Sequence, residues 1–458
     1  MKYKKSAIFI SFDAVAVSGI TVEAAKIAKS LKMKGIQSYL DLGYDIKVDK
    51  GKFNKPYGIE KDIYRDVFKL IRIEAITSIA NYNTAFIEYV HNTLINKSLY
   101  ISGEEVSSLL MKIEKTAEKI SDLIVACWQK LDIGHVVVEN GTLPENIIYT
   151  KALYLAIEKY GYQNNLDNFV IWRDHDLMWN SEKAIMKYGL PPYTYAVKPV
   201  KSRYITYVTL NNDLKKNLEE WCNHNVEVKV KKNTYNFSTV GVGKRTNIRC
   251  QLNINSNDIL IARTTRVIFQ KRLDRDIILV SNLNEMFEES NSKRRVFLVI
   301  AGDINEDNQC YQKLISFAEE IKVSRYVKFL GALPHEDIKT ESDPICIEDL
   351  YFSCDLVSFL TSYDYDSYGN PIGEAVSQQR CYIATSYEYY HEVYGQYGFK
   401  APIMEISAEQ DGLPTNEFIF ELYKFLNNSK EMKRVAEENF HLGRRVLSSN
   451  VTEFFNIK

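Results

Sequence analysis

The chain alternates between strand-like and helix-like patterns in two successive runs, separated by a polar, asparagine-rich segment. The first run opens with an apolar strand pattern at 7–12, a helix pattern at 21–33 and a second strand pattern at 38–42. The same alternation restarts at 259. Because strands that alternate with helices form parallel sheets, we expect an α/β fold. Two such runs predict two Rossmann-like β/α/β domains that face each other across a cleft.

The length of the chain supports this division, because 458 residues exceed what one compact core usually holds. We expect an N-terminal Rossmann-like domain at 1–234 and a linker at 235–258. The second Rossmann-like domain is expected at 259–435. A C-terminal helix at 436–458 is predicted to pack back on the first domain. The first domain also contains a long stretch, from about 61 to 131, with helical periodicity and few breakers.

Bulk properties narrow the class of protein. The formal net charge is -1 and the pI is about 6.7, which argues against a nucleic-acid-binding protein. Seven scattered cysteines without a CxxC pair indicate reduced thiols. The sequence contains no window of about 18 apolar residues, so we expect no membrane-spanning helix. We therefore expect a cytoplasmic protein with at most peripheral membrane contact; the sequence does not indicate its oligomeric state.

The stretch "DSYGNPIGE", from Asp366 to Glu374, follows a strand-like run and leads into a helix. A helix N-terminus offers unpaired backbone N–H groups that favour an anion. Gly369 at the turn would allow close approach of backbone to a ligand. Taken alone, however, the stretch is better explained as a turn with a capping acid.

A second motif, "TTRVIFQKRLD", places Arg266 and Lys271 five residues apart after a strand and before a helix. Two cations at the carboxyl end of a strand suit a pyrophosphate group. A basic pair alone is more often a solvated surface.

Together the two motifs resemble those of the GT-B retaining glycosyltransferases of family four. That family carries "G-R-L-x-x-x-K-G", then a strand ending in "F-L-G", then "E-x-F-G-x-x-x-x-E-A". The segments "TRVIFQKR", "VKFLGAL" and "DSYGNPIGEA" are similar to these in order and spacing. The resemblance covers about 259–385 and is weaker in the N-terminal half. It departs from the family where Asp366 replaces a glutamate and Arg272 replaces a glycine.

The resemblance implies a metal-independent enzyme that moves a sugar from a nucleotide-diphosphate sugar to a hydroxyl, with retention of configuration. Asp366 would hydrogen-bond hydroxyls of the donor sugar, and Glu374 would bind the ribose. The amides of Gly369 and Asn370 would hold sugar or phosphate. Pro371, in the same donor-binding loop, removes one backbone N–H.

Other positions follow from the same resemblance. Arg266 and Lys271 would neutralise the leaving diphosphate, whose own oxygen is thought to accept the acceptor's proton in this family. Backbone near Leu333 would contact the base, and Gly19 would let backbone approach the diphosphate. His175 matches in kind the family's histidine near the donor sugar and acceptor. Catalysis would then rest on positioning and charge stabilisation.

Two alternatives stay open. The first is a GT-A-like, metal-dependent glycosyltransferase in which Asp174 and Asp176 of "DHD" hold a divalent ion on the diphosphate. The second is a sugar-nucleotide-binding or scaffold protein without turnover. We expect no cofactor beyond a donor linked to UDP or GDP. The acceptor would be a saccharide, glycolipid, protein or small molecule.

Overall fold

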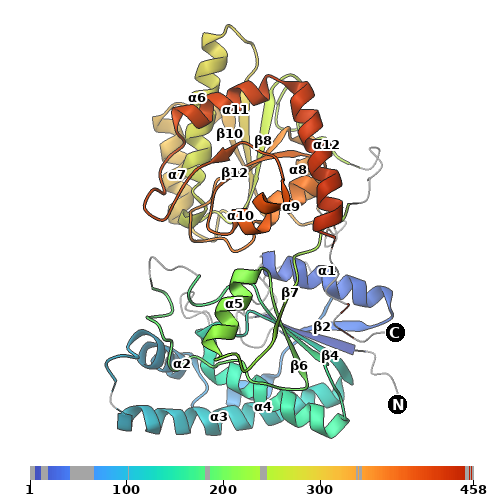
Figure 1. Ribbon diagram of the computed structural model, residues 1–458, viewed down its shortest axis with the longest axis vertical. Helices are drawn as coiled ribbons and strands as arrows, with labels where there is room; N and C mark the ends of the chain where they lie inside the picture. The colour runs from blue at the N-terminus through green and yellow to red at the C-terminus, as the bar shows by residue number, and fades with distance from the viewer. Residues whose placement is uncertain are drawn as a thin grey trace. The chain divides into compact units, whose positions relative to one another are not determined.

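The computed structural model describes residues 6–11, 19–41, 67–101, 103–180, 186–237, 245–336, 339, 343–448, 453 and 455. The chain folds as two compact units, Met1–Lys232 with Asn450–Lys458, and Asn233–Ser449. Each is an α/β unit built on a parallel sheet, drawn in Figure 1 in blue to green and in yellow-green to red. The segment at 235–258, expected as a linker, is grouped with the second unit.

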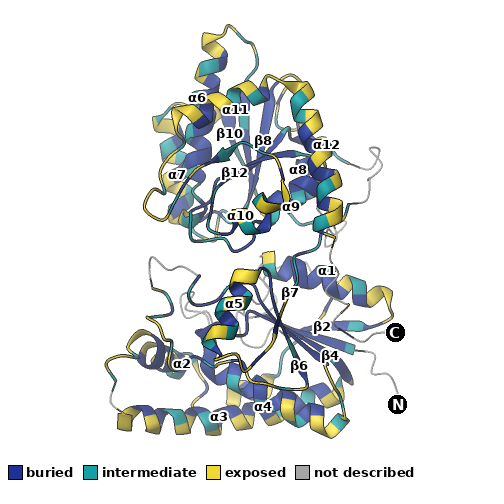
Figure 2. Cartoon of the chain, in the orientation of Figure 1, coloured by how far each residue is buried: buried dark blue, intermediate teal, exposed yellow. Residues whose placement is uncertain are grey.

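The first unit holds a seven-stranded parallel sheet in the order β3-β2-β1-β4-β5-β6-β7. Its strands are β1 (Ser6–Ser11), β2 (Gln37–Asp41), β3 (Lys69–Ile71), β4 (Ile133–Glu139), β5 (Val170–Asp174), β6 (Ile205–Thr209) and β7 (Val228–Val230). Its helices of eight residues or more are α1 (Gly19–Met33), α2 (Thr84–His91), α3 (Gly103–Lys130), α4 (Ile147–Asn164) and α5 (Asn212–Trp221). The central strands are buried, as Figure 2 shows in dark blue.

The expected helical stretch at 61–131 is corrected by the structure. Residues 61–66 lie outside the described part of the chain. Lys69–Ile71 form strand β3 instead of helix. The backbone there hydrogen-bonds to β2 at the edge of the sheet, and this pairing takes the place of the hydrogen bonds that a helix would form. The rest of the stretch is divided among short helices and α3, whose apolar face packs on α4.

The second unit holds a six-stranded parallel sheet in the order β10-β9-β8-β11-β12-β13. Its strands are β8 (Ile259–Thr264), β9 (Val296–Ala301), β10 (Val327–Gly331), β11 (Leu356–Phe359), β12 (Cys381–Thr385) and β13 (Ile403–Met404). Its helices are α6 (Leu273–Glu289), α7 (Asn308–Glu320), α8 (Ile347–Ser353), α9 (Asn370–Ser377), α10 (Tyr390–Val393), α11 (Asn416–Leu426) and α12 (Ser429–Val446). Apolar side chains of these strands and of α6, α7 and α11 form one buried cluster.

The C-terminal helix differs from the expectation of a helix at 436–458. Helix α12 begins at Ser429 and ends at Val446, within the second unit. Two described residues beyond α12, Glu453 and Phe455, contact the first unit. Glu453 accepts from Lys231 Nζ at 2.7 Å, and the Phe455 ring lies 4.7 Å from the His135 ring. The described end of the chain therefore returns to the first unit without being part of the helix.

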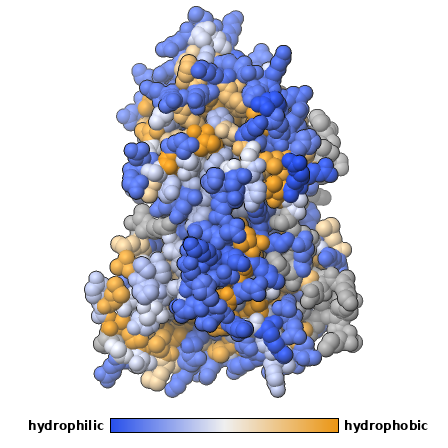
Figure 3. Space-filling view, in the orientation of Figure 1, coloured by the Kyte–Doolittle hydropathy of each residue, from blue (hydrophilic) through white to orange (hydrophobic). Residues whose placement is uncertain are grey.

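No helix in the described part of the chain is long and apolar enough to cross a membrane. Figure 3 shows apolar residues scattered among hydrophilic ones on the visible face of both units.

Each sheet contains a point where the strand order reverses, between β1 and β4 in the first unit and between β8 and β11 in the second. In open α/β sheets, ligands bind outside the carboxyl ends of the strands at such a point. The loops that leave β8 and β11 are the two segments that carry the motifs.

Candidate functional site

Lys271 and Asp366 meet at the reversal point of the second sheet. Lys271 Nζ lies 2.5 Å from Asp366 Oδ1, and Thr361 Oγ1 donates to the other carboxylate oxygen. Both charged side chains are mostly buried. The pair joins the loop after β8 to the loop after β11.

The environment of Lys271 is poorly solvated. Burial lowers the pKa of Lys271, and the neighbouring Asp366 carboxylate opposes that shift. The Lys271 ammonium also lies 4.7 Å from the centre of the Tyr365 ring, at a distance that allows a cation–π contact. The site thus holds an amine in low dielectric, where its attraction for an anion is stronger than in water.

Arg266, from the same loop, is paired differently. Its Nε donates to Glu306 Oε1 at 2.8 Å, and Nη2 donates to the same oxygen. Its Nη1 donates to the Tyr365 hydroxyl at 3.2 Å. Tyr365 therefore contacts both cations, Arg266 through its hydroxyl and Lys271 through its ring.

Gly369 cannot be replaced without displacing its neighbours. Its φ is +81°, and a Cβ there would lie 2.5 Å from the Tyr387 hydroxyl and 3.0 Å from the Phe359 ring. The Tyr394 hydroxyl donates to the Gly369 carbonyl at 2.9 Å, while Tyr387 donates to Tyr368 O at 2.7 Å. Two tyrosines thus fix the backbone of the motif loop.

Helix α9 begins immediately after this turn, at Asn370, with Pro371 in its first turn. The Asn370 side-chain oxygen accepts from Asn233 Nδ2 at 2.7 Å and from the Tyr235 hydroxyl at 3.1 Å. The side chain of Asn370 is therefore engaged within the protein, and a ligand would use its backbone.

Glu374 lies one turn into α9, with 13% of its side chain exposed. The Tyr351 hydroxyl donates to its Oε2 at 2.7 Å, and His335 Nε2 lies 3.7 Å from its Oε1. His335 follows the half-buried Leu333 in the loop after β10, and its Nδ1 is 3.1 Å from Glu348. Burial alone would raise the pKa of Glu348, but the hydrogen bond and charge of His335, together with hydrogen bonds from the Glu336 and Glu348 backbone N–H groups, lower it to about 2.

A buried ion pair between Arg263 and Asp276 holds the backbone at Lys271. Arg263 donates to the Lys271 carbonyl at 2.7 Å and to the Ser358 carbonyl at 2.9 Å. Its Nε lies 3.3 Å from Asp276 Oδ2, and both side chains are at most 1% exposed. Burial raises the pKa of Asp276 to about 6, an effect that the Arg263 charge opposes.

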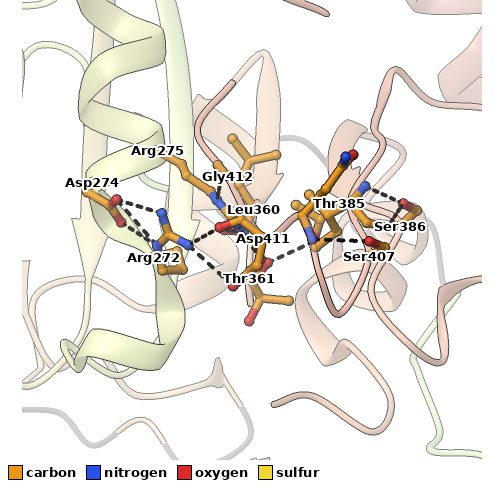
Figure 4. Close-up of polar contacts among 12 residues, drawn as sticks. Arg272, Asp274, Arg275, Leu360, Thr361, Thr385, Ser386, Ser407, Asp411 and Gly412 are labelled. Carbon is orange, nitrogen blue, oxygen red and sulfur yellow. Dashed lines mark hydrogen bonds and ion pairs between the residues drawn. The ribbon is translucent and has the colours of Figure 1, made fainter. Parts of the chain in front are cut away.

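A second cluster fixes the start of α6, as Figure 4 shows. Arg272 has a left-handed φ of 50°, and its guanidinium binds both Asp274 and Asp411. Arg275 also binds Asp411 and donates to the Thr361 carbonyl at 2.6 Å. Arg272 thus adopts a left-handed, glycine-like conformation and is held by two carboxylates.

In the first unit, His175 lies directly after β5, beside the end of β4. Its Nε2 is 2.8 Å from Glu139 Oε2, and the Arg173 Nε lies 3.3 Å from the same oxygen. All three side chains are at most 5% exposed. The Asn140 side chain accepts from the His175 backbone N–H at 2.7 Å. Gly19 opens α1, but the loop at 12–18 before it lies outside the described residues.

Asp174, one of the two aspartates beside His175, is held by hydrogen bonds inside the first unit. Asp174 is fully buried, and it accepts from the Thr142 backbone N–H at 3.1 Å and from its hydroxyl at 2.6 Å. Burial raises the pKa of Asp174 to about 7. Among the residues that the structure describes, no three His, Cys, Asp or Glu side chains gather as a metal-binding group.

The structure brings Arg266, Lys271 and Asp366 together and places Glu374 on the following helix. It also adds residues around them that sequence reasoning missed: Glu306, Tyr365, Thr361, Tyr351, His335 and Arg263. A signal for Tyr365 was present in the tyrosine-rich segment before Asp366. Glu306 carried none, because its contact depends on the neighbouring strand β9.

Comparisons with known proteins agree with this architecture. No protein-family model and no curated protein matches the sequence. Solved structures match in fold along almost the whole chain. One is a glycosyltransferase from Rickettsia africae ESF-5, with a TM-score of 0.58, 15% identity, and coverage of 97% of this chain and 95% of that one. Another is the Thermosynechococcus elongatus sucrose-phosphate synthase, with a TM-score of 0.59, 12% identity, and coverage of 97% and 95%.

A third is Anabaena Alr3699/HepE in complex with UDP-glucose, with a TM-score of 0.56, 13% identity, and coverage of 97% and 95%. These neighbours are GT-B glycosyltransferases. The GT-B fold, with two Rossmann-like domains, is thereby confirmed. The GT-A alternative is wrong as a fold, because each half is an open parallel sheet of the Rossmann type.

Proposed function

We propose that the protein is a glycosyltransferase that moves a sugar from a nucleoside-diphosphate sugar to a hydroxyl group of an acceptor. The observation that carries this proposal is the convergence of Arg266, Lys271 and Asp366 at the reversal point of the second sheet. Cations there suit a diphosphate, and a carboxylate beside them suits sugar hydroxyls. The structural neighbours, which are glycosyltransferases, support the same reaction class.

Different residues of this site bind different parts of the donor. Arg266 and Lys271 bind the diphosphate and stabilise the charge that develops as it leaves. Asp366 orients the donor sugar, while Glu374 accepts hydrogen bonds from the ribose hydroxyls. Backbone at Leu333 contacts the base. Because one solved neighbour is named as a complex with UDP-glucose, a UDP-sugar is the donor to test first.

We propose that transfer proceeds with retention and without a metal ion. The two cations supply the charge stabilisation that a divalent ion supplies in GT-A enzymes. The departing phosphate oxygen takes the proton from the acceptor hydroxyl, so no protein base is needed. We assign to His175, which Glu139 holds in place, the contact with donor sugar and acceptor that the family resemblance implies. Gly19, at the start of α1, lets backbone approach the diphosphate.

The first experiment is a thermal-shift panel of UDP- and GDP-sugars on the full chain. A ligand at about 100 times its dissociation constant stabilises a protein by roughly 2.7 kcal/mol. A hit is then followed for release of the nucleoside diphosphate, with and without saccharide acceptors. Slow release without an acceptor supports an enzyme. Binding with no release under any condition supports the sugar-nucleotide-binding protein instead, and no binding contradicts both.

A further inference from the structure

The side chain of Glu306 forms an ion pair with Arg266. Glu306 lies in the loop between β9 and α7, and its Oε1 accepts from both Nε and Nη2 of Arg266. This loop leaves the strand next to β8, so its carboxylate reaches the cation from the neighbouring strand end. A phosphate bound by the same guanidinium edge would have to take the place of this carboxylate.

Each of the two cations already has a carboxylate partner. Arg266 pairs with Glu306, and Lys271 pairs with Asp366. A diphosphate diester adds about two negative charges to these four. A phosphate bound to Arg266 would be repelled by the Glu306 carboxylate for as long as that carboxylate remains on the same guanidinium. We propose that Glu306 competes with the donor diphosphate for Arg266 and lowers the affinity of the site for diphosphate ligands.

This inference rests on the proposed function and adds a residue that sets the strength of donor binding. Tyr365 makes the exchange possible, because its hydroxyl holds Nη1 of Arg266 from another direction at 3.2 Å. The guanidinium thus keeps one contact when Glu306 leaves. An opposite role for Glu306 predicts the opposite result: if it mainly holds Arg266 in position, its removal should weaken diphosphate binding.

The size of the effect follows from exposure. The Arg266 side chain is 35% exposed and that of Glu306 is 22% exposed, so solvent screens the pair. Partly exposed ion pairs contribute about 0.2 to 1 kcal/mol, which corresponds to a change of about 1.4- to 5-fold in a dissociation constant. Glu306→Gln should therefore tighten nucleoside-diphosphate binding within this range.

The test is calorimetric titration of the full chain with whichever of UDP, GDP, ADP and CDP gives the largest thermal shift. Glu306→Gln is compared with Asp303→Asn, a matched control in the same loop. Asp303 carries the same charge, but its carboxylate accepts from the Asn305 backbone N–H instead of contacting Arg266. Both substitutions are repeated in an Arg266→Ala background.

Competition predicts that Glu306→Gln tightens binding, that Asp303→Asn leaves it within error, and that the gain disappears when Arg266 is absent. Equal or weaker binding by Glu306→Gln overturns the inference while leaving the glycosyltransferase proposal intact. A gain that persists without Arg266, or that Asp303→Asn matches, reduces Glu306 to a general charge effect and also overturns it. Absence of binding by every variant, wild type included, contradicts the proposed function itself.

Discussion

Lys271 and Asp366, 95 residues apart in the sequence, lie 2.5 Å apart between ammonium and carboxylate. The contact joins the loops of β8 and β11, the two strands at which the order of the second sheet reverses. It places one cation and one carboxylate at the same point.

Removing either cation should slow sugar transfer. Arg266→Ala and Lys271→Ala should each lower kcat by about 100-fold or more, as loss of one preorganised charge-stabilising group does. Steady-state kinetics on a donor found by the thermal-shift panel measures this. Arg325→Ala is the control, because Arg325 lies just before β10, at the end of the sheet where the strands begin, whereas Arg266 and Lys271 lie where β8 ends. Rates within a few-fold of wild type for both variants would mean that the pyrophosphate role is wrong.

Chelation should leave turnover unchanged. Arg266 and Lys271 supply positive charge at the diphosphate site, so exhaustive EDTA treatment should not abolish transfer. The rate before and after treatment, with and without added Mn²⁺, gives the answer. A complete loss that Mn²⁺ restores would contradict metal independence. The anomeric configuration of the product, read by NMR, tests retention in the same reaction.

Glu374 and Asp366 should differ in which part of the donor they bind. Glu374→Gln removes the charge that strengthens hydrogen bonds to hydroxyls, so it should weaken binding of nucleoside diphosphate and nucleotide sugar alike. Asp366→Asn should leave bare diphosphate binding within a few-fold and impair transfer. Calorimetric titration with both ligands measures the difference. If the two substitutions weaken binding of the nucleoside diphosphate equally, the separate roles of Glu374 and Asp366 are refuted.

Arg272 should tolerate glycine better than alanine. Both substitutions remove the contacts with Asp274 and Asp411. Only alanine keeps a side chain in the left-handed conformation, which costs about 1 kcal/mol outside glycine. Thermal unfolding of the two variants compares them under identical conditions. A melting temperature for Arg272→Gly at or below that of Arg272→Ala would show that backbone strain is not what distinguishes them.

Asp174 should make stability fall as pH rises through neutrality. Burial raises its pKa to about 7, whereas an unfolded aspartate titrates near 3.9. Between these values the native state keeps a proton that the unfolded state releases, so the free energy of unfolding declines with increasing pH, by up to about 4 kcal/mol in total. Asp174→Asn cannot titrate there.

Melting temperatures of wild type and Asp174→Asn at pH 5, 6, 7 and 8 check this prediction. Their difference should favour the wild type most at pH 5, shrink up to about pH 7 and then level off. A difference that does not change with pH would show that Asp174 is ionised throughout the range.

Local sequence determined where most of the helices and strands lie along the chain. The strand patterns expected at 7–12, at 38–42 and from 259 correspond to β1, β2 and β8. Helix α5 begins at a local cap, where the Asn211 side chain accepts from Leu214 N at 2.8 Å. The spacing from Asp366 to Glu374 likewise placed one acid before the turn and one on α9. These features depend on residues close in the chain, so periodicity and turn chemistry are enough to predict them.

Only the tertiary structure decided which side chains meet. Strand β3 at Lys69–Ile71 exists because β2 offers a free edge, and a helical period within the segment cannot reveal that. Glu306 reaches Arg266 because β9 lies beside β8 in the sheet, and Arg263 reaches the Ser358 carbonyl because β8 pairs with β11, a strand far from it in the sequence. The physical reason is that contacts across parallel strands depend on the order of the sheet, while propensity depends on neighbours in the chain.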